Sequence, residues 1–245
     1  MPVSASDSWT EGTMTRRSPS TADRPVLPLA EVTRLTEDLA RQVRERDGVA
    51  LAGRELRRHA QALMRRVHAN AAEPPEVRAL AEEAGRLLRE PGAEEGAFDA
   101  LQEYVEARLL WSVTREEPLP LARELGVSSV VYLSGIGDLV GEVRRLALDA
   151  LSRGEIGRAE GSLRLMEELF HLLLSFDVPR SLLPLKPKQD FARALLERTR
   201  SEVVLARVMA RARVMARAYP PGVGGAPGRG GERSKRPAAR GEAVP

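Results

Sequence analysis

The chain contains no cysteine, no long apolar run and few aromatic side chains. The absence of cysteine excludes disulfides and thiolate metal sites, and it is typical of proteins of a reducing cytoplasm. No stretch of about 18 apolar residues is present, so no membrane span is expected. The first residues are polar and lack the apolar centre of a secretory signal, and Met14 is an alternative start to Met1. These features predict a cytoplasmic protein.

Aromatic residues make up only 4% of the 245 residues, so leucine, valine and alanine must build most of the core. The commonest residues (Ala, Leu, Arg and Glu) are strong helix formers. One short β-branched run, around Val130 and Val131, lies within a helical pattern. The composition therefore predicts an all-α bundle.

Periodicity and breaks divide the chain into three parts. Residues 1–27 are predicted to be a disordered leader, residues 28–217 an all-helical domain, and residues 218–245 a disordered basic tail rich in Gly, Pro and Arg. A bundle of six to seven helices is expected. Its helices are predicted at about 29–70, 75–88, 94–113, 128–152, 156–176 and 188–217, with a short helical turn before Gly126.

Lysine is scarce: only three of the 38 basic residues are lysines, and the others are arginines. Arginine makes better bidentate phosphate contacts, but a GC-rich genome produces the same bias. In the first helix several arginines lie roughly opposite an apolar stripe, which indicates either a phosphate-binding face or a plain solvated one. The predicted nucleic-acid-binding residues are Arg54, Arg57, Arg58, Arg65, Arg66, Lys188 and Arg193.

Four carboxylates stand in two helical segments that are otherwise apolar or small. Glu103 and Glu106 are three residues apart, and Asp138 and Glu142 are four apart. Such spacing places both acids of a pair on one helix face, with Cβ atoms roughly 5–6 Å apart. If the two helices pack together, the four acids would form a site for a hard divalent cation. The alternative is that Glu103 and Glu106 are exposed helix charges, paired with Arg108.

Two other motifs do not carry a function. The glycines between residues 135 and 141 resemble a dinucleotide fingerprint, but no strand precedes them. Glu168 and His171 form only half of the di-iron motif of four-helix proteins, and no second copy of the motif exists.

The acidic segments also carry a family resemblance. The chain resembles the translin family, closest to translin-associated factor X (TRAX) and its prokaryotic relatives. The matching segments are 98–107, 132–149 (YLSGIGDLVGEVRRLALD), 154–155 and 188–203 (KQDFARALLERTRSEV), and with the first helix the similarity covers about residues 29–205.

The resemblance implies an all-helical fold and hollow octamers that bind single-stranded RNA or DNA. It also implies a magnesium-dependent endoribonuclease, because Glu103, Glu106 and Asp138 match catalytic acids of factor X-like members, and Glu142 matches a neighbouring acid of the motif. The expected ion is Mg²⁺, with Mn²⁺ as an alternative. A single chain that carries all the acids suggests a homo-oligomer. Two rival hypotheses stay open: a non-catalytic shell that binds single-stranded nucleic acid, and a helical scaffold that binds only protein.

Overall fold

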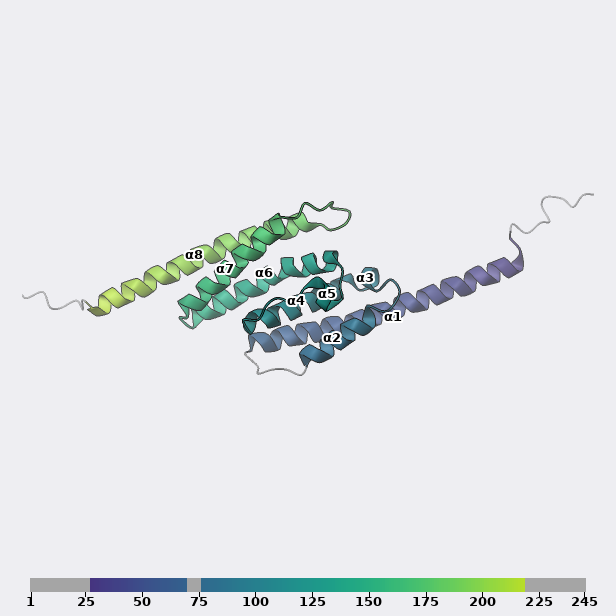
Figure 1. Cartoon of the computed structure of the whole chain (residues 1–245), viewed down its shortest axis with the longest axis horizontal. Helices are drawn as coiled ribbons and strands as arrows, with labels where there is room; N and C mark the ends of the chain where they lie inside the picture. The colour runs from purple at the N-terminus through teal and green to yellow at the C-terminus, as the bar shows by residue number, and fades with distance from the viewer. Residues whose placement is uncertain (1–26, 70–75, 219–245) are drawn as a thin grey trace, which may run out of the picture. The chain divides into compact units, whose positions relative to one another are not determined.

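The computed structural model describes residues 27–69 and 76–218, and every regular element within them is an α-helix (Figure 1). This confirms the predicted all-α class. The described helices are α1 (Leu29–His68), α2 (Glu76–Leu87), α3 (Ala93–Gly96), α4 (Phe98–Thr114), α5 (Ala122–Leu125), α6 (Ser129–Ser152), α7 (Ile156–Leu174) and α8 (Leu185–Ala218). Apart from residues 27 and 218, the predicted leader and tail lie outside the described residues.

The chain divides into two compact units, one ending at Gly135 and the other beginning at Ile136. Helix α6 contributes its first residues to the first unit and the rest to the second. In the part of the chain that the structure describes, no helix has the length and apolar character needed to cross a membrane.

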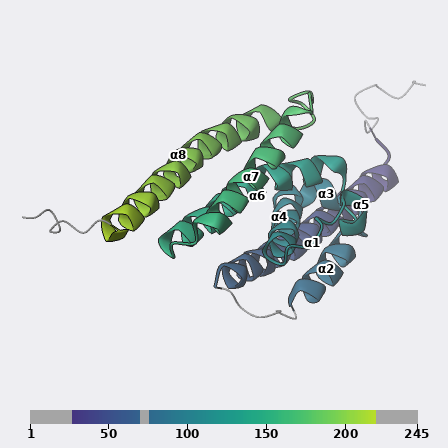
Figure 2. The ribbon, with the colours of Figure 1, turned by 60° about the vertical axis from the view of Figure 1, so that its left-hand side comes forward.

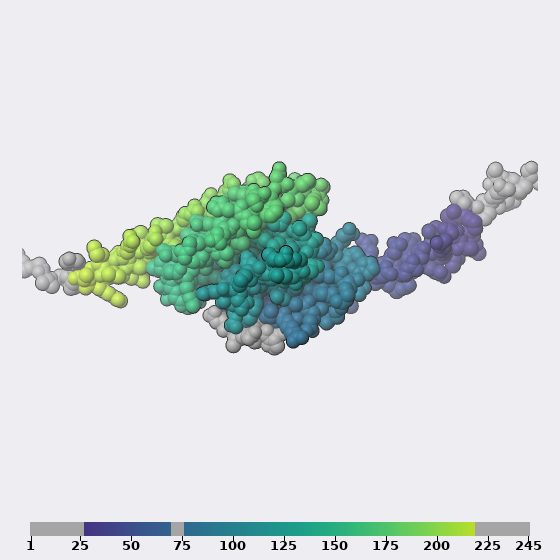
Figure 3. Space-filling model, in the orientation of Figure 1, coloured from purple at the N-terminus to yellow at the C-terminus, as the bar shows by residue number. Residues whose placement is uncertain are grey.

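The second half of α1 supports the first unit. It packs against α2 and α4 through a buried stripe at three- and four-residue spacing, which includes Leu56, Ala60 and Leu63. At Gly53 an added Cβ would lie 2.9 Å from the Cβ of Ala97, so the glycine allows α1 to approach the start of α4 closely. The first half of α1, coloured purple, extends beyond the other helices of its unit (Figure 3).

The helix predicted at 94–113 is divided in the structure. Ala97 leaves the helical conformation, with φ −132° and ψ 28°, and separates the single turn of α3 from α4. Close packing accompanies this break, since a Cβ at Gly96 would lie 2.8 Å from Cγ1 of Val49. Together with α5, this short turn raises the number of described helices to eight, above the predicted six to seven.

Helix α4 ends at a residue in the left-handed conformation. Glu116 has φ 57°, its N–H donates to the carbonyl of Val113, and the N–H of Glu117 donates to the carbonyl of Ser112. This is the Schellman pattern, in which glycine usually takes the position that Glu116 holds here.

In the second unit, α7 and α8 run side by side (Figures 1 and 2). Arg144 of α6 donates two hydrogen bonds to the carboxylate of Glu202 and one to Oγ1 of Thr199, which ties α6 to α8. Helix α8 begins at Leu185, slightly earlier than the predicted start near Lys188. The reason is that Pro187 falls in the first turn, where a helix tolerates proline.

Candidate functional site

The first acidic pair lies on α4, a helix that is buried nearly all round. Glu106 is 9% exposed, and the side chain of Glu103 is 13% exposed. Charged residues are rarely buried to this extent unless they are paired. The alternative that these acids are ordinary solvent-exposed helix charges is therefore wrong.

A tight helix contact adjoins this pair within the first unit. The hydroxyl of Ser134, near the start of α6, donates to Oε1 of Gln102 on α4. A Cβ at Gly135 would lie 2.6 Å from Cγ1 of Val105, so only glycine permits this approach. The residues beside Glu103 and Glu106 are therefore held at a close crossing of α4 with the first turns of α6.

Glu103 is paired with an arginine of another helix. Nε of Arg57, on α1, donates to Oε1 of Glu103 at 2.6 Å. The second oxygen, Oε2, is buried and has no hydrogen-bond partner among the described residues. Arg108 interacts with Tyr104, where burial raises the pKa of the phenol above its ordinary value and the guanidinium acts in the opposite direction.

The second acidic pair lies on the part of α6 that belongs to the second unit. Nζ of Lys188, on α8, donates to Oδ1 of Asp138 at 2.5 Å, and the two side chains are 20% and 30% exposed. A Cβ at Gly137 would lie 2.7 Å from Cδ of Lys188, so the lysine lies directly against the backbone of α6. Glu142 follows Asp138 by about one helical turn.

The donor chemistry of both pairs fits a hard cation, because Mg²⁺ prefers oxygen ligands and carboxylates supply them. The buried Oε2 of Glu103 is an oxygen of this kind that lacks a partner. The two pairs belong to different units, and across residues 27–69 and 76–218 no three or more His, Asp or Glu side chains are gathered so as to hold a metal ion. One shared ion therefore stays a prediction.

Two of the predicted nucleic-acid-binding residues line a cavity in the first unit. Arg54 and Arg57 contribute to its wall together with Glu95 and Asp99, and its volume is about 330 Å³. The cavity lies between α1, α3 and the start of α4. Arg57 lines the cavity and also donates a hydrogen bond to Glu103. The lining carries both signs of charge, which suits a polar ligand better than an apolar one.

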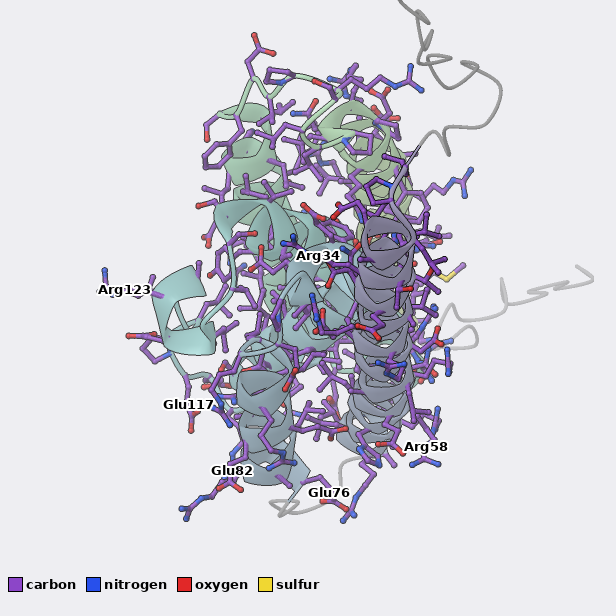
Figure 4. The ribbon with its side chains drawn as sticks, turned by 90° about the vertical axis from the view of Figure 1, so that its right-hand side faces the viewer. Arg34, Arg58, Glu76, Glu82, Glu117 and Arg123 are labelled. Atoms are coloured by element: carbon purple, nitrogen blue, oxygen red, sulfur yellow. The ribbon has the colours of Figure 1, made fainter. Side chains whose placement is uncertain are left out.

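The remaining predicted basic residues differ in their surroundings. Arg58 lies on the outer side of α1 (Figure 4), where its Nη2 is 3.3 Å from Nε2 of His59. Arg65 is exposed, whereas Arg66 pairs with Glu76 at the end of α1. In the second unit, the guanidinium of Arg193 lies over the ring of Phe170, 5.7 Å from its centre.

The chain was compared with family models, curated proteins and solved structures. No protein-family model matches it. An uncharacterized protein of Methanocaldococcus jannaschii is 33% identical over 104 residues, which are 42% of this chain. The match spans 47%, about half, of that protein's length. The solved structure of apo-NeC3PO has a TM-score of 0.66 at 24% identity, covering 75% of this chain and all of that one, which shows likeness of fold alone.

The crystal structure of AfC3PO adds likeness of sequence. It is 30% identical with a TM-score of 0.65, and the match covers 75% of this chain and 98% of that one. The chain belongs to the translin family. A second AfC3PO structure, a complex with duplex RNA, matches at 28% identity with a TM-score of 0.65, over 73% of this translin-family chain and 97% of that one.

The sequence of this translin-family protein did not predict which basic residues pair with the acids. Arg57 and Lys188 were predicted to bind nucleic acid, but in the structure they hold Glu103 and Asp138. These partners are 46 and 50 residues apart in the sequence, and no local pattern links them. One signal for the Lys188 contact is Gly137. A glycine lowers helix stability, so its presence within α6 suggests that another side chain packs against the helix there.

Proposed function

We propose that this translin-family protein binds single-stranded RNA, or DNA, and cleaves RNA as a magnesium-dependent endoribonuclease of the factor X type. The observation that carries the proposal is the burial of Glu103 and Glu106 in α4, with Oε2 of Glu103 lacking a hydrogen-bond partner among the described residues. Burying carboxylates is costly, so a binding role explains them better than a structural one. The duplex RNA complex of AfC3PO supports the choice of RNA.

In this proposal Glu103, Glu106 and Asp138 hold the ion, and Glu142 is a further ligand or a base. The donor chemistry supports this assignment, because all four side chains are carboxylates and Mg²⁺ prefers oxygen ligands. When bound, Mg²⁺ or Mn²⁺ would supply an activated water and neutralise charge that develops on the phosphate.

The other proposed residues act on the RNA backbone. Arg54, Arg58 and Arg65 are exposed on α1, and guanidinium groups suit bidentate contacts to phosphate. Contacts of this kind would make the affinity for RNA fall as the salt concentration rises. A flexible single strand reaches an enclosed site more easily than a duplex, so cleavage is expected to favour single strands.

The test compares wild-type protein with the Glu103→Gln and Glu106→Gln variants on labelled RNA, single-stranded and duplex, with Mg²⁺ or with a chelator. We expect each variant to lose more than about 100-fold in cleavage rate, since changes even to outer-shell partners of metal sites cost 10–100-fold. Glu82→Gln is the matched control, because Glu82 is an exposed carboxylate that also pairs with an arginine (Figure 4). Undiminished cleavage by a folded variant would contradict the assignment.

A second candidate, a non-catalytic shell that binds single-stranded nucleic acid, is favoured by one observation. Arg57 and Lys188 already neutralise two of the four acids, as they would if the acids were structural. This candidate predicts salt-sensitive binding of RNA that is indifferent to chelator and gives no product. A scaffold that binds only protein predicts no retention of RNA even at low salt.

A further inference from the structure

Two of the proposed metal ligands each hold a basic side chain from another helix. Arg57 of α1 reaches Glu103 of α4 at 2.6 Å, and Lys188 of α8 reaches Asp138 of α6 at 2.5 Å. Each contact lies within its own unit of the chain, so the arrangement occurs twice on separate structural supports.

Both contacts differ from surface ion pairs such as Lys186–Asp190, whose side chains are 68% and 56% exposed. The side chains of Glu103 and Asp138 are 13% and 30% exposed, and charge is costly there unless an opposite charge compensates it. Each contact joins side chains of two different helices, and Lys188 also lies against the backbone of α6 at Gly137. The two basic residues therefore satisfy acids that would otherwise be poorly solvated.

We propose that Arg57 and Lys188 are internal counter-cations, which occupy Glu103 and Asp138 until a divalent ion displaces them. The inference rests on the proposed function, because it takes Glu103 and Asp138 as ligands of the ion. An ammonium or guanidinium group and a metal ion compete for the same carboxylate oxygens, so the resident group lowers the apparent affinity for the ion. Once displaced, Arg57 and Lys188 are positive charges without their acidic partners, and they are then available to the phosphates of RNA.

Ion binding tests the competition directly and does not depend on catalysis. Arg57→Gln and Lys188→Gln remove the charge and keep a polar side chain of similar reach. Binding of Mn²⁺ to the full chain, followed by electron paramagnetic resonance, is expected to tighten roughly two- to five-fold in each variant, the range that an ion pair of modest strength allows. Thermal melting in chelator is expected at a lower temperature than for wild type, and Mn²⁺ restores it.

Matched controls lie on the same two helices. Arg41→Gln removes an arginine of α1 whose partner, Asp38, is not a proposed ligand, and Lys186→Gln removes a lysine of α8 whose partner, Asp190, is not one either. Both controls are expected to bind Mn²⁺ as wild type does. Lys188→Arg keeps the positive charge and is expected to retain the weaker, wild-type affinity for the ion.

Binding of an RNA oligomer provides the second measurement. Wild type is expected to gain affinity for RNA when Mn²⁺ is added, and the two Gln variants are expected to lose this gain.

The outcomes separate this inference from the proposed function. Mn²⁺ affinity equal to or weaker than wild type in both Gln variants overturns the counter-cation role, while cleavage by the wild-type protein that depends on Glu103 leaves the proposed function in place. Absence of Mn²⁺ binding from wild type and from every variant overturns both.

Discussion

Tyr104, Ser134 and Thr199 are polar side chains that the fold buries almost completely. Each makes a hydrogen bond: Tyr104 with Arg108, Ser134 with Gln102, and Thr199 with the carbonyl of Leu195. Buried polar groups of this kind require partners, because an unmet hydrogen bond in the interior costs about 1–3 kcal/mol. The second oxygen of Glu103 is one of a few buried side-chain atoms without a hydrogen-bond partner among the described residues, and the proposed ion would supply one.

Tyr104 leads to a prediction at alkaline pH. Burial raises its pKa above 10.0, so the unfolded chain ionises first as the pH rises. When the pKa of a group is higher in the folded protein than in the unfolded chain, its contribution to stability is fully present at a pH below the unfolded-state pKa. This contribution is lost as the pH rises towards the folded-state pKa. We therefore expect the free energy of unfolding to fall above about pH 10 in wild type, and to fall less in Tyr104→Phe.

Urea denaturation across this pH range measures the effect, and absorbance of tyrosinate reports the ionisation. Tyr132→Phe is a useful comparison, because burial also raises the pKa of Tyr132, with Glu124 adding to the rise. Ionisation of Tyr104 at or below its ordinary pKa in the folded protein would contradict the prediction.

At this scale the sequence singled out the acids, whose role as ligands stays a prediction, and it did not predict their basic partners. The apolar neighbours of Glu103 and Glu106 favoured a site over exposed helix charges, and the burial of these two acids in the structure rules out the exposed-charge alternative. The partners could not be predicted, because the contacts of Arg57 and Lys188 depend on which helices pack together.

At the scale of helices, periodicity predicted the long elements and missed the short ones. Gly96 weakens the helix just before the break at Ala97, but a single glycine is tolerated within a helix, so the break could not be predicted from residues 94–97 alone. The contacts of Gly53 with Ala97 and of Gly96 with Val49 accompany the break, and both join residues far apart in the sequence. Tertiary packing therefore overrides propensity at this position.

The end of α4 gives a prediction of stability. Glu116 holds a left-handed conformation that glycine adopts without a steric cost. We expect Glu116→Gly to raise the free energy of unfolding by about 1 kcal/mol, because a side chain in this conformation costs roughly that amount. Urea denaturation with an unchanged m-value would measure the gain.

The neighbouring residue supplies the control. Glu117 is not among the described residues with positive φ, so Glu117→Gly removes no backbone strain. It makes the unfolded chain more flexible, and it is therefore expected to lower the free energy of unfolding. The prediction fails if both variants are equally stable or if Glu116→Gly is the weaker of the two.

At the scale of the whole molecule, exposed apolar side chains follow two long helices. On the first half of α1 they are Leu29, Val32, Leu35, Leu39 and Val43. On the second half of α8 they are Val204, Leu205, Val208, Met209, Val214 and Met215. Soluble monomers rarely expose apolar surface in continuous stripes, so these faces support the proposed homo-oligomer. The octamer itself follows only from the family resemblance.

Light scattering tests the assembly. We expect a particle several times heavier than the 26.8 kDa chain, with a melting temperature that rises with protein concentration. Leu35→Glu combined with Leu39→Glu places charges within the α1 stripe and is expected to reduce the mass. Arg44→Glu, an exposed change on the same helix, serves as the control. A wild-type mass equal to one chain would contradict the prediction.

The absence of a side chain at Gly137 lets Lys188 lie against α6 while its ammonium reaches Asp138. A methyl group at Gly137 would lie 2.7 Å from Cδ of Lys188, so the lysine or the helix would have to move. If Asp138 binds the proposed ion, a side chain at position 137 would therefore alter the affinity for that ion while every acid stayed the same.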